Sequence, residues 1–271
     1  MVTYTMLSDK KHTDTLFKEN IFTDQAGLTT RYYDTGSDKP ALIFIHGGKR
    51  KSLRYYRQAL EDLAQNYRII APEIPGYVND FCPKDCLDLH DLAAFFNRLM
   101  ESLKISSYYA AGHSMGGGVA ILMSAENPRL LKVVASNSAG CPLHITRNRL
   151  LLALAYNGIR QGCSRQALKT IKKAYKSLKD IRRGRKGRTR YVLKSANRAL
   201  NKNYSGLLKK ANSPTLLIHA KRDNLFKKYS AQYLADLIPN TTLLEVKGFH
   251  DWPMHEQKRF AYVTERFLKM P

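Results

Sequence analysis

The sequence has few cysteines and no long apolar run, and each shortage excludes a class of protein. Four cysteines among 271 residues are too few for a disulfide scaffold. Cys82 and Cys86 are close in sequence, but no second pair has the spacing of metal ligands, so we expect no zinc site. No run of about 18 apolar residues occurs, which argues against a membrane-spanning helix. Because residues 1–18 lack the apolar centre of a secretion signal, we expect a reduced, cytoplasmic protein.

Acidic residues are scarce in one part of the chain. The formal net charge is +23, from 45 Lys and Arg against 22 Asp and Glu. Residues 141–210 hold 20 of these bases but a single acid, Asp180, whereas the rest of the chain is close to balance. We therefore treat residues 141–210 as a distinct basic module, separate from residues 1–140 and 211–271.

Outside the basic module, short apolar segments alternate with segments of helical periodicity. Hydrophobic residues make up 44% of the chain, enough for a sizeable core. The apolar runs predict eight strands, over residues 20–24, 28–34, 41–45, 67–71, 107–111, 131–136, 214–220 and 242–246. Helices are expected from about residue 52 and over residues 87–103, 119–123, 229–237 and 257–268. Alternating strands and helices predict an α/β fold whose mostly parallel central sheet has helices on both faces.

One motif lies between the fifth predicted strand and the helix that follows it. Gly112-His113-Ser114-Met115-Gly116 has the pattern Gly-x-Ser-x-Gly, in which the serine occupies a strained strand-to-helix turn. The glycines are needed because a side chain would collide with neighbouring backbone at so tight a bend. The start of a helix also brings backbone N–H groups to the serine oxygen. We interpret this turn as a nucleophile elbow rather than as an ordinary glycine-rich turn with a surface serine.

A serine attacks only if a base takes its proton and an acid orients that base. In the architecture of the nucleophile elbow, the chain order is Ser, then Asp or Glu, then His. Ser114 is followed by Asp223 and then by His250, each just beyond a predicted strand. Two alternatives stay open: Asp223 as a helix N-cap, and His255 in place of His250 as the base.

On these motifs the chain resembles the α/β-hydrolases, in particular their capped, esterase- or lipase-like branch. The resemblance implies a helical cap inserted after the sixth strand, so that residues 141–210 are the cap and residues 1–140 and 211–271 the core. It implies that Ser114 is the nucleophile, Asp223 the acid and His250 the base. The backbone N–H groups of Gly48 and Met115 would form the oxyanion hole. No cofactor and no metal is expected.

Three features of the sequence bear on this resemblance. The second acid location of the family follows the sixth strand, but residues 137–145 contain no carboxylate, which leaves Asp223 as the acid. Many relatives follow His-Gly with a bulky apolar residue and proline, whereas Gly48 is followed here by Lys-Arg-Lys. The loop 73–80 departs from the pattern Asp-x-x-Gly-x-Gly-x-Ser. The last two departures leave the oxyanion loop and the nearby pocket wall open.

The basic module is amphipathic. It begins with an apolar run at residues 150–156, and apolar residues then recur every three or four positions between Leu168 and Ile181. A second basic helix is expected over residues 190–200, after a flexible loop at 182–188. The charge favours an anionic ester, or contact with an anionic membrane surface and a lipid ester. Nucleic acid ranks last, because no binding motif beyond charge supports it.

These observations together predict a serine hydrolase that cleaves a carboxylic ester. A carbon–carbon bond hydrolase is an alternative, because it uses the same triad. A binding protein built on a hydrolase scaffold is a second alternative from a different class.

Overall fold

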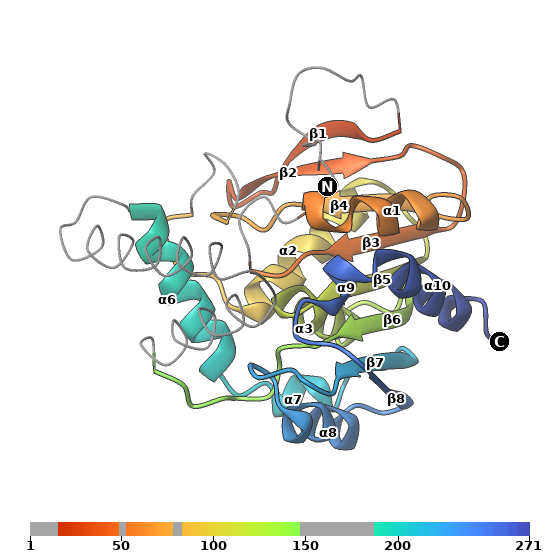
Figure 1. Ribbon diagram of the computed structural model, residues 1–271. Coiled ribbons are helices and arrows are strands. Elements are labelled where there is room, and N and C mark those ends of the chain that lie inside the picture. Colours follow the sequence, from red (N-terminus) through yellow and green to blue (C-terminus); the bar gives the residue numbers. More distant parts are fainter. Residues whose placement is uncertain (1–15, 49–52, 78–82, 147–186) are drawn as a thin grey trace, which may run out of the picture.

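The computed structural model describes residues 16–48, 53–77, 83–146 and 187–271 of the chain (Figure 1). Its strands are β1 (Lys18–Thr23), β2 (Thr29–Asp34), β3 (Ala41–Ile45), β4 (Arg68–Pro72), β5 (Tyr108–His113), β6 (Leu130–Ser136), β7 (Thr215–Ala220) and β8 (Thr241–Val246). Its helices are η1 (Leu53–Tyr56, a 3-10 helix), α1 (Arg57–Leu63), α2 (Leu89–Ser102), α3 (Met115–Ser124), α6 (Gly187–Asn201), α7 (Ser205–Leu208), α8 (Lys228–Leu237), α9 (Trp252–His255) and α10 (Gln257–Leu268).

The eight strands form one sheet in the order β1-β2-β4-β3-β5-β6-β7-β8. Strand β2 pairs antiparallel with β1 and with β4, and all other neighbours are parallel. Parallel neighbours require crossover helices, which cover both faces of the sheet. The predicted α/β class with a mostly parallel sheet is therefore confirmed.

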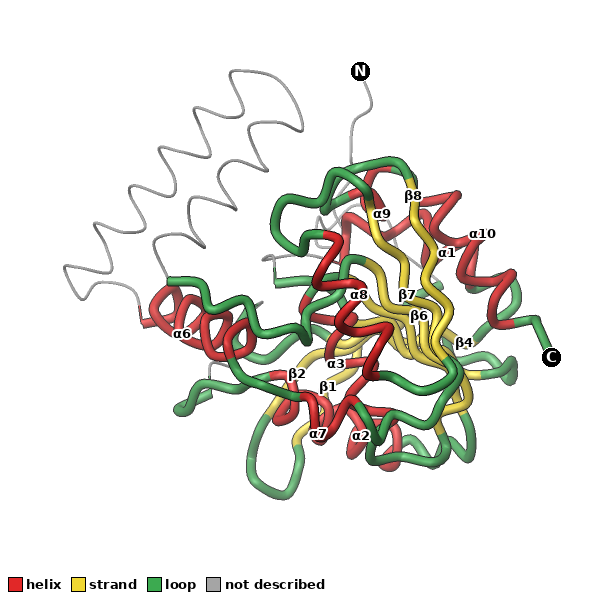
Figure 2. Tube along the Cα trace, turned by 90° about the horizontal axis from the view of Figure 1, so that it is seen from below, coloured by secondary structure: helices red, strands yellow, loops and turns green. Residues whose placement is uncertain are grey.

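Strand β3 shows how the two faces are filled. Ile43 and Ile45 belong to the core cluster that contains residues of α2 and α3. Leu42 and Phe44 point to the other face and pack with residues of α1 and α10. Successive residues of a strand point to opposite faces, so a strand covered on both sides is apolar throughout. Figure 2 shows α1 and α10 on one face and α2, α3 and α8 on the other.

Most predicted elements agree with the structure within one or two residues. The helix expected from residue 52 begins as the 3-10 helix η1 and continues as α1 from Arg57. The helix expected over 190–200 is α6, which already includes Gly187 and Arg188, so the predicted loop at 182–188 ends earlier. The apolar run at 150–156, the stripe from Leu168 to Ile181 and the rest of that loop lie outside the described residues.

Between β6 and β7 the structure describes residues 137–146, α6 and α7. Helix α6 lies at one side of the sheet, beyond the start of α2 (Figure 1). Within the described ranges, no helix is long and apolar enough to cross a membrane.

Candidate active site

Ser114 lies at a turn that forces its backbone into an unusual conformation. Its φ of 57° and ψ of −121° are rarely adopted by a residue with a side chain. A Cβ on Gly112 would lie 2.3 Å from the carbonyl oxygen of Gly116, and one on Gly116 would lie 2.1 Å from that of Ile45. The serine backbone is fixed as well, because its N–H donates to the Ser136 carbonyl at 2.9 Å. The turn has the geometry expected of a nucleophile elbow.

The three predicted side chains meet at the carboxyl edge of the sheet. The Ser114 hydroxyl lies 3.0 Å from Nε2 of His250, and Nδ1 of His250 lies 2.8 Å from Oδ2 of Asp223. Because a carboxylate only accepts, Nδ1 of the imidazole carries the proton and Nε2 is open to accept one from the serine. His255, the alternative base, is exposed at the end of α9. The structure therefore brings His250, and not His255, to Ser114.

Asp223 uses its two carboxylate oxygens for different partners. Oδ1 accepts hydrogen bonds from the backbone N–H groups of Leu225 at 2.8 Å and Phe226 at 3.0 Å. Oδ2 accepts from His250 and, at 2.6 Å, from Nδ2 of Asn137. Helix α8 begins only at Lys228, so Asp223 caps a local turn and not a helix. The capping role and the contact with His250 therefore coexist in one side chain.

The surroundings of Asp223 favour its ionised form. Burial alone would raise the pKa of this carboxyl, but the charge and hydrogen bond of His250 and the hydrogen bonds from Asn137 and the backbone lower it below its ordinary value. An ionised Asp223 can stabilise a protonated imidazole during proton transfer.

His113, inside the motif, contacts the base from behind. Its Nε2 donates to the backbone carbonyl of His250 at 2.8 Å, and its Nδ1 lies 2.6 Å from the Tyr56 hydroxyl. The two imidazole rings are 4.9 Å apart. His113 therefore orients the loop that carries His250.

His46 fixes the loop that carries Gly48. Its Nε2 accepts from the N–H of Ile74 at 3.0 Å, and its Nδ1 donates to the Gly47 carbonyl at 2.6 Å. Complete burial lowers the pKa of His46 to about 4, so the ring is neutral at neutral pH. A Cβ on Gly47 would lie 3.2 Å from Cβ of Ser114, which shows how closely this loop approaches the nucleophile turn.

Sequence reasoning missed two residues of this network. Asn137 contacts Asp223 from the end of β6, the second acid location of the family, and its φ of 46° is one that asparagine tolerates well. Nε1 of Trp252 donates to Oδ1 of Asn137 at 2.9 Å, which fixes the orientation of the amide. The absence of a carboxylate after β6 was visible in the sequence, but the contact depends on how β6 and β7 pair.

In the described part of the chain, three side chains lie close enough together to be possible metal ligands: His113, His250 and Asp251. The ring nitrogens of both histidines already have hydrogen-bond partners. An ion would have to displace these bonds, so the arrangement favours proton transfer over metal binding.

Comparisons with known proteins bear on the fold of the chain. The family model of the alpha/beta hydrolase fold matches residues 40–171. The 2-hydroxymuconate semialdehyde hydrolase of Pseudomonas sp. (strain CF600) is 30% identical over 45% of this chain and 44% of its own length. The 2-hydroxy-6-oxo-6-(2'-aminophenyl)hexa-2,4-dienoic acid hydrolase of Metapseudomonas resinovorans is 24% identical over 91% of this chain and 90% of its own.

A crystal structure of a membrane phospholipase A, described as a bacterial virulence factor, superposes with a TM-score of 0.73 at 18% identity, over 94% of this chain and 86% of that one. The first curated relatives are matched over only 32%, 44% and 37% of their own lengths. The resemblance that the motifs indicate is confirmed at the level of the fold: the chain is an α/β-hydrolase-fold protein.

Proposed function

We propose that the chain is a serine hydrolase that cleaves a carboxylic ester through an acyl-enzyme on Ser114. The observation that carries the proposal is the unbroken series of hydrogen bonds from Ser114 through His250 to Asp223. Nε2 of His250 takes the serine proton as Oγ attacks the ester carbonyl carbon. The tetrahedral intermediate then collapses and the alkoxide leaves with that proton. Water attacks the acyl-enzyme with His250 again as the base, releasing the acid and restoring the Ser114 hydroxyl.

We assign the oxyanion hole to the backbone N–H groups of Gly48 and Met115. Met115 is the first residue of α3, where N–H groups have no acceptor within the helix and the dipole favours negative charge. Gly48 lies on the loop that His46 fixes and that approaches Ser114. Donors held in place before the reaction stabilise the oxyanion at little reorganisation cost.

For the substrate we favour a lipid or another anionic ester, with residues 141–210 as a basic cap on the core. The cation excess of this segment supports the choice, because it would draw negatively charged groups towards the site. Helix α6, within the segment, contacts the loop after β4 at the edge of the sheet where Ser114 lies. The same charge supports peripheral contact with an anionic membrane.

A fluorophosphonate probe tests the role of Ser114. We expect it to label the wild-type chain and not Ser114→Ala, whose ester hydrolysis should fall on the order of 10⁴–10⁶-fold. The control is Ser124→Ala, a buried serine of α3 that bonds the Ile121 carbonyl and should keep both properties. Labelling that survives Ser114→Ala would remove the proposal. A folded wild-type chain that never reacts, and whose salt-sensitive binding disappears when residues 182–188 are neutralised, would indicate a binding protein.

Carbon–carbon bond hydrolysis is the second candidate, because two of the relatives reported above are named as hydrolases of a hydroxymuconate semialdehyde and of a substituted hexa-2,4-dienoic acid, and not of an ester. The same serine and histidine would serve it. A series of p-nitrophenyl esters measured beside ring-opened dienoate ketones separates the two reactions. Higher kcat/KM for the dienoates would replace the ester proposal.

A further inference from the structure

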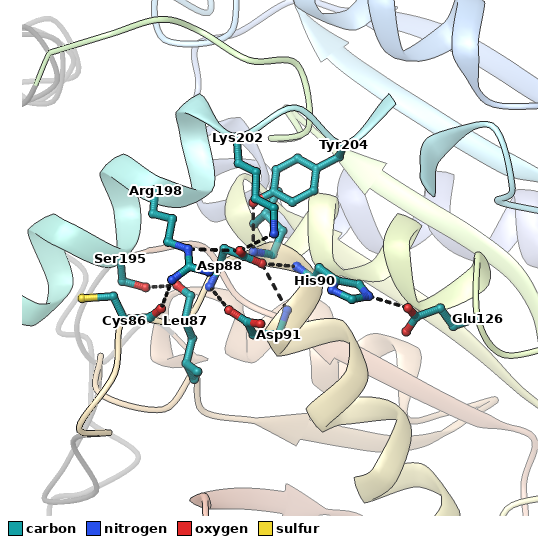
Figure 3. Close-up of polar contacts among 11 residues, drawn as sticks. Cys86, Leu87, Asp88, His90, Asp91, Glu126, Ser195, Arg198, Lys202 and Tyr204 are labelled. Carbon is teal, nitrogen blue, oxygen red and sulfur yellow. Dashed lines mark hydrogen bonds and ion pairs between the residues drawn. The ribbon is translucent and has the colours of Figure 1, made fainter. Parts of the chain in front are cut away.

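Helix α6 is joined to the core through a buried carboxylate, Asp88. Figure 3 shows its side chain between the start of α2 and the helix above it. Oδ2 of Asp88 accepts from Nε of Arg198 at 3.2 Å and from Nζ of Lys202 at 2.7 Å. The carboxylate is fully buried, whereas the two cationic side chains, one helical turn apart on and just beyond α6, are about half exposed. These three residues are called the Asp88 cluster below.

The other oxygen of Asp88 has a separate, local role. Oδ1 accepts from the backbone N–H groups of His90 at 2.9 Å and Asp91 at 3.2 Å, so Asp88 is the N-cap of α2. Its own N–H donates to Oδ2 of Asp91, which completes a capping box. One oxygen therefore caps α2 while the other binds the cations.

The Asp88 cluster differs from an ordinary surface ion pair. Burial would raise the pKa of Asp88, but the hydrogen bond and charge of Lys202 and the backbone N–H groups outweigh it, so the pKa lies below its ordinary value. Exposed ion pairs contribute little, whereas a buried carboxylate without its cations is strongly unfavourable. Further bonds run beside the cluster, from Nη1 of Arg198 to the Cys86 carbonyl at 3.2 Å and from Ser195 to the Leu87 carbonyl.

The first half of α6 packs on the loop that follows β4. The Tyr191 ring lies over Gly76, where an added Cβ would fall 2.2 Å from the ring. The Tyr191 hydroxyl lies 3.4 Å from the Pro75 carbonyl. The Tyr77 hydroxyl lies 3.4 Å from the carbonyl of Val192, so the loop and the helix bond in both directions. This loop departs from the family pattern, and the structure places it under α6.

Tyr77 connects α6 with the candidate oxyanion hole. It is fully buried, and its hydroxyl lies 3.5 Å from Sδ of Met115. A Cβ on Gly48 would lie 3.3 Å from Cε1 of its ring. Both residues assigned to the oxyanion hole therefore have Tyr77 as a neighbour, and the hydroxyl of Tyr77 also contacts Val192 of α6.

We propose that Asp88 is a positioning residue for this site: by binding Arg198 and Lys202 it fixes α6, and α6 fixes Tyr77 against Gly48 and Met115. The catalytic part of this inference rests on the proposed function. It assigns a role to a carboxylate outside the Ser114 motif. It also makes the position of Tyr77 beside the oxyanion hole depend on an ion pair.

The test is Asp88→Asn, in which the amide oxygen still caps α2 but the charge that binds Arg198 and Lys202 is lost. Hydrogen exchange should become roughly tenfold faster or more at the amides of α6 and of Tyr77, because charge-assisted bonds to a buried group are lost. Exchange in α2 and β5 should stay unchanged. For p-nitrophenyl acetate, kcat should fall about tenfold with little change in KM, since the oxyanion donors act in the transition state.

Asp91→Asn is the matched control, because it removes an acid from the same helix start without touching α6. It should leave exchange in α6 and kcat at wild-type values. Arg198→Gln should show part of the effect of Asp88→Asn, because Lys202 still binds the carboxylate. Added to Asp88→Asn, it should change exchange and kcat little further, because the charge that binds Arg198 is already absent.

Each outcome decides a different step. Equal exchange rates in α6 for Asp88→Asn and the wild-type chain would overturn the anchoring of α6. Faster exchange in α6 with unchanged exchange at Tyr77, Gly48 and Met115 and unchanged kcat would overturn the link to the site. A wild-type chain that hydrolyses no ester would instead contradict the proposed function, and the exchange measurements would still decide the inference.

Discussion

Asp223 and Asp88 are fixed in the same way. In each, one carboxylate oxygen accepts backbone N–H groups two and three residues later, and the other binds a side chain more than 25 residues away in sequence. The local bonds orient the carboxylate, so the distant partner meets an acceptor that is already in place. An Asp-to-Asn change at such a position keeps the local turn and removes the charge, which separates the two roles experimentally.

Asn137 offers a sharp test of the charge at Asp223. Asn137→Asp would put a second carboxylate 2.6 Å from Oδ2 of Asp223. Two carboxylates at that distance do not both ionise freely, so one proton is retained between them and competes with the bond to His250. We expect kcat/KM for an ester to fall roughly 10–100-fold at pH 7 with KM little changed. Steady-state kinetics measures this.

Asn137→Gly is the control for that variant, because glycine tolerates the positive φ and brings no charge. We expect a smaller loss from it, since only one hydrogen bond to Asp223 disappears. If Asn137→Gly and Asn137→Asp lose activity equally, the charge at residue 137 does not act on Asp223.

At the scale of elements, the nucleophile turn depends on close backbone contacts. Gly116→Ala would press a methyl group against the carbonyl of Ile45 at the end of β3, which cannot move as a flexible side chain would. We expect the free energy of unfolding to fall by about 3 kcal/mol or more, at the upper end of overpacking costs. Urea unfolding monitored by circular dichroism measures it.

Gly206→Ala in α7 is the control, because no atom beyond its own turn of helix lies within 4 Å of the added Cβ and alanine favours the helix. It should stabilise the chain by about 0.5–1 kcal/mol. A Gly116→Ala chain as stable as this control would show that the contact between α3 and β3 is looser than the structure describes.

The elements also show what could be predicted from the sequence. Apolar runs such as 41–45 and the period of 257–268 locate β3 and α10, because burial acts on each residue locally. The four-residue helices α7 and α9 show too few periods to be recognised. The strand order depends on pairing between distant segments, and local pattern carries no information about it.

The candidate site shows the same difference between features of local sequence and contacts between distant segments. Ser114, Asp223 and His250 could be predicted because the motif and the chain order are sequence features. Asn137 and Asp88 could not, because their roles arise from contacts across 86 and 110 residues of the chain. Hydrogen bonds over such separations appear only once the strands are paired.

At the scale of the whole molecule, the lowered pKa values of two buried histidines predict a loss of stability in mild acid. Protonation of His46 at Nε2 would break its bond with the N–H of Ile74, and burial lowers its pKa from 6.5 to about 4. Burial also lowers the pKa of His219. Below pH 6.5 the unfolded chain binds protons that these folded imidazoles do not, so acid favours unfolding. The pKa values of Asp223 and Asp88 are lowered from 3.8, so both carboxylates stay ionised down to about pH 4. Their contribution to stability is lost at lower pH, outside the range in which the histidines act.

We therefore expect the free energy of unfolding to fall as the pH is lowered from about 6.5 to about 4, with His46 contributing about 3 kcal/mol of the loss. Urea titrations at unit intervals from pH 8 to pH 4 measure the slope. His46→Gln removes the titrating ring, so its free energy of unfolding should fall by about 3 kcal/mol less than that of the wild-type chain across this pH window. Its stability at pH 8 should nevertheless be lower than wild type. His255→Gln, at an exposed position, is the control for losing a histidine. A wild-type slope that persists in His46→Gln would show that the acid sensitivity of the fold arises elsewhere.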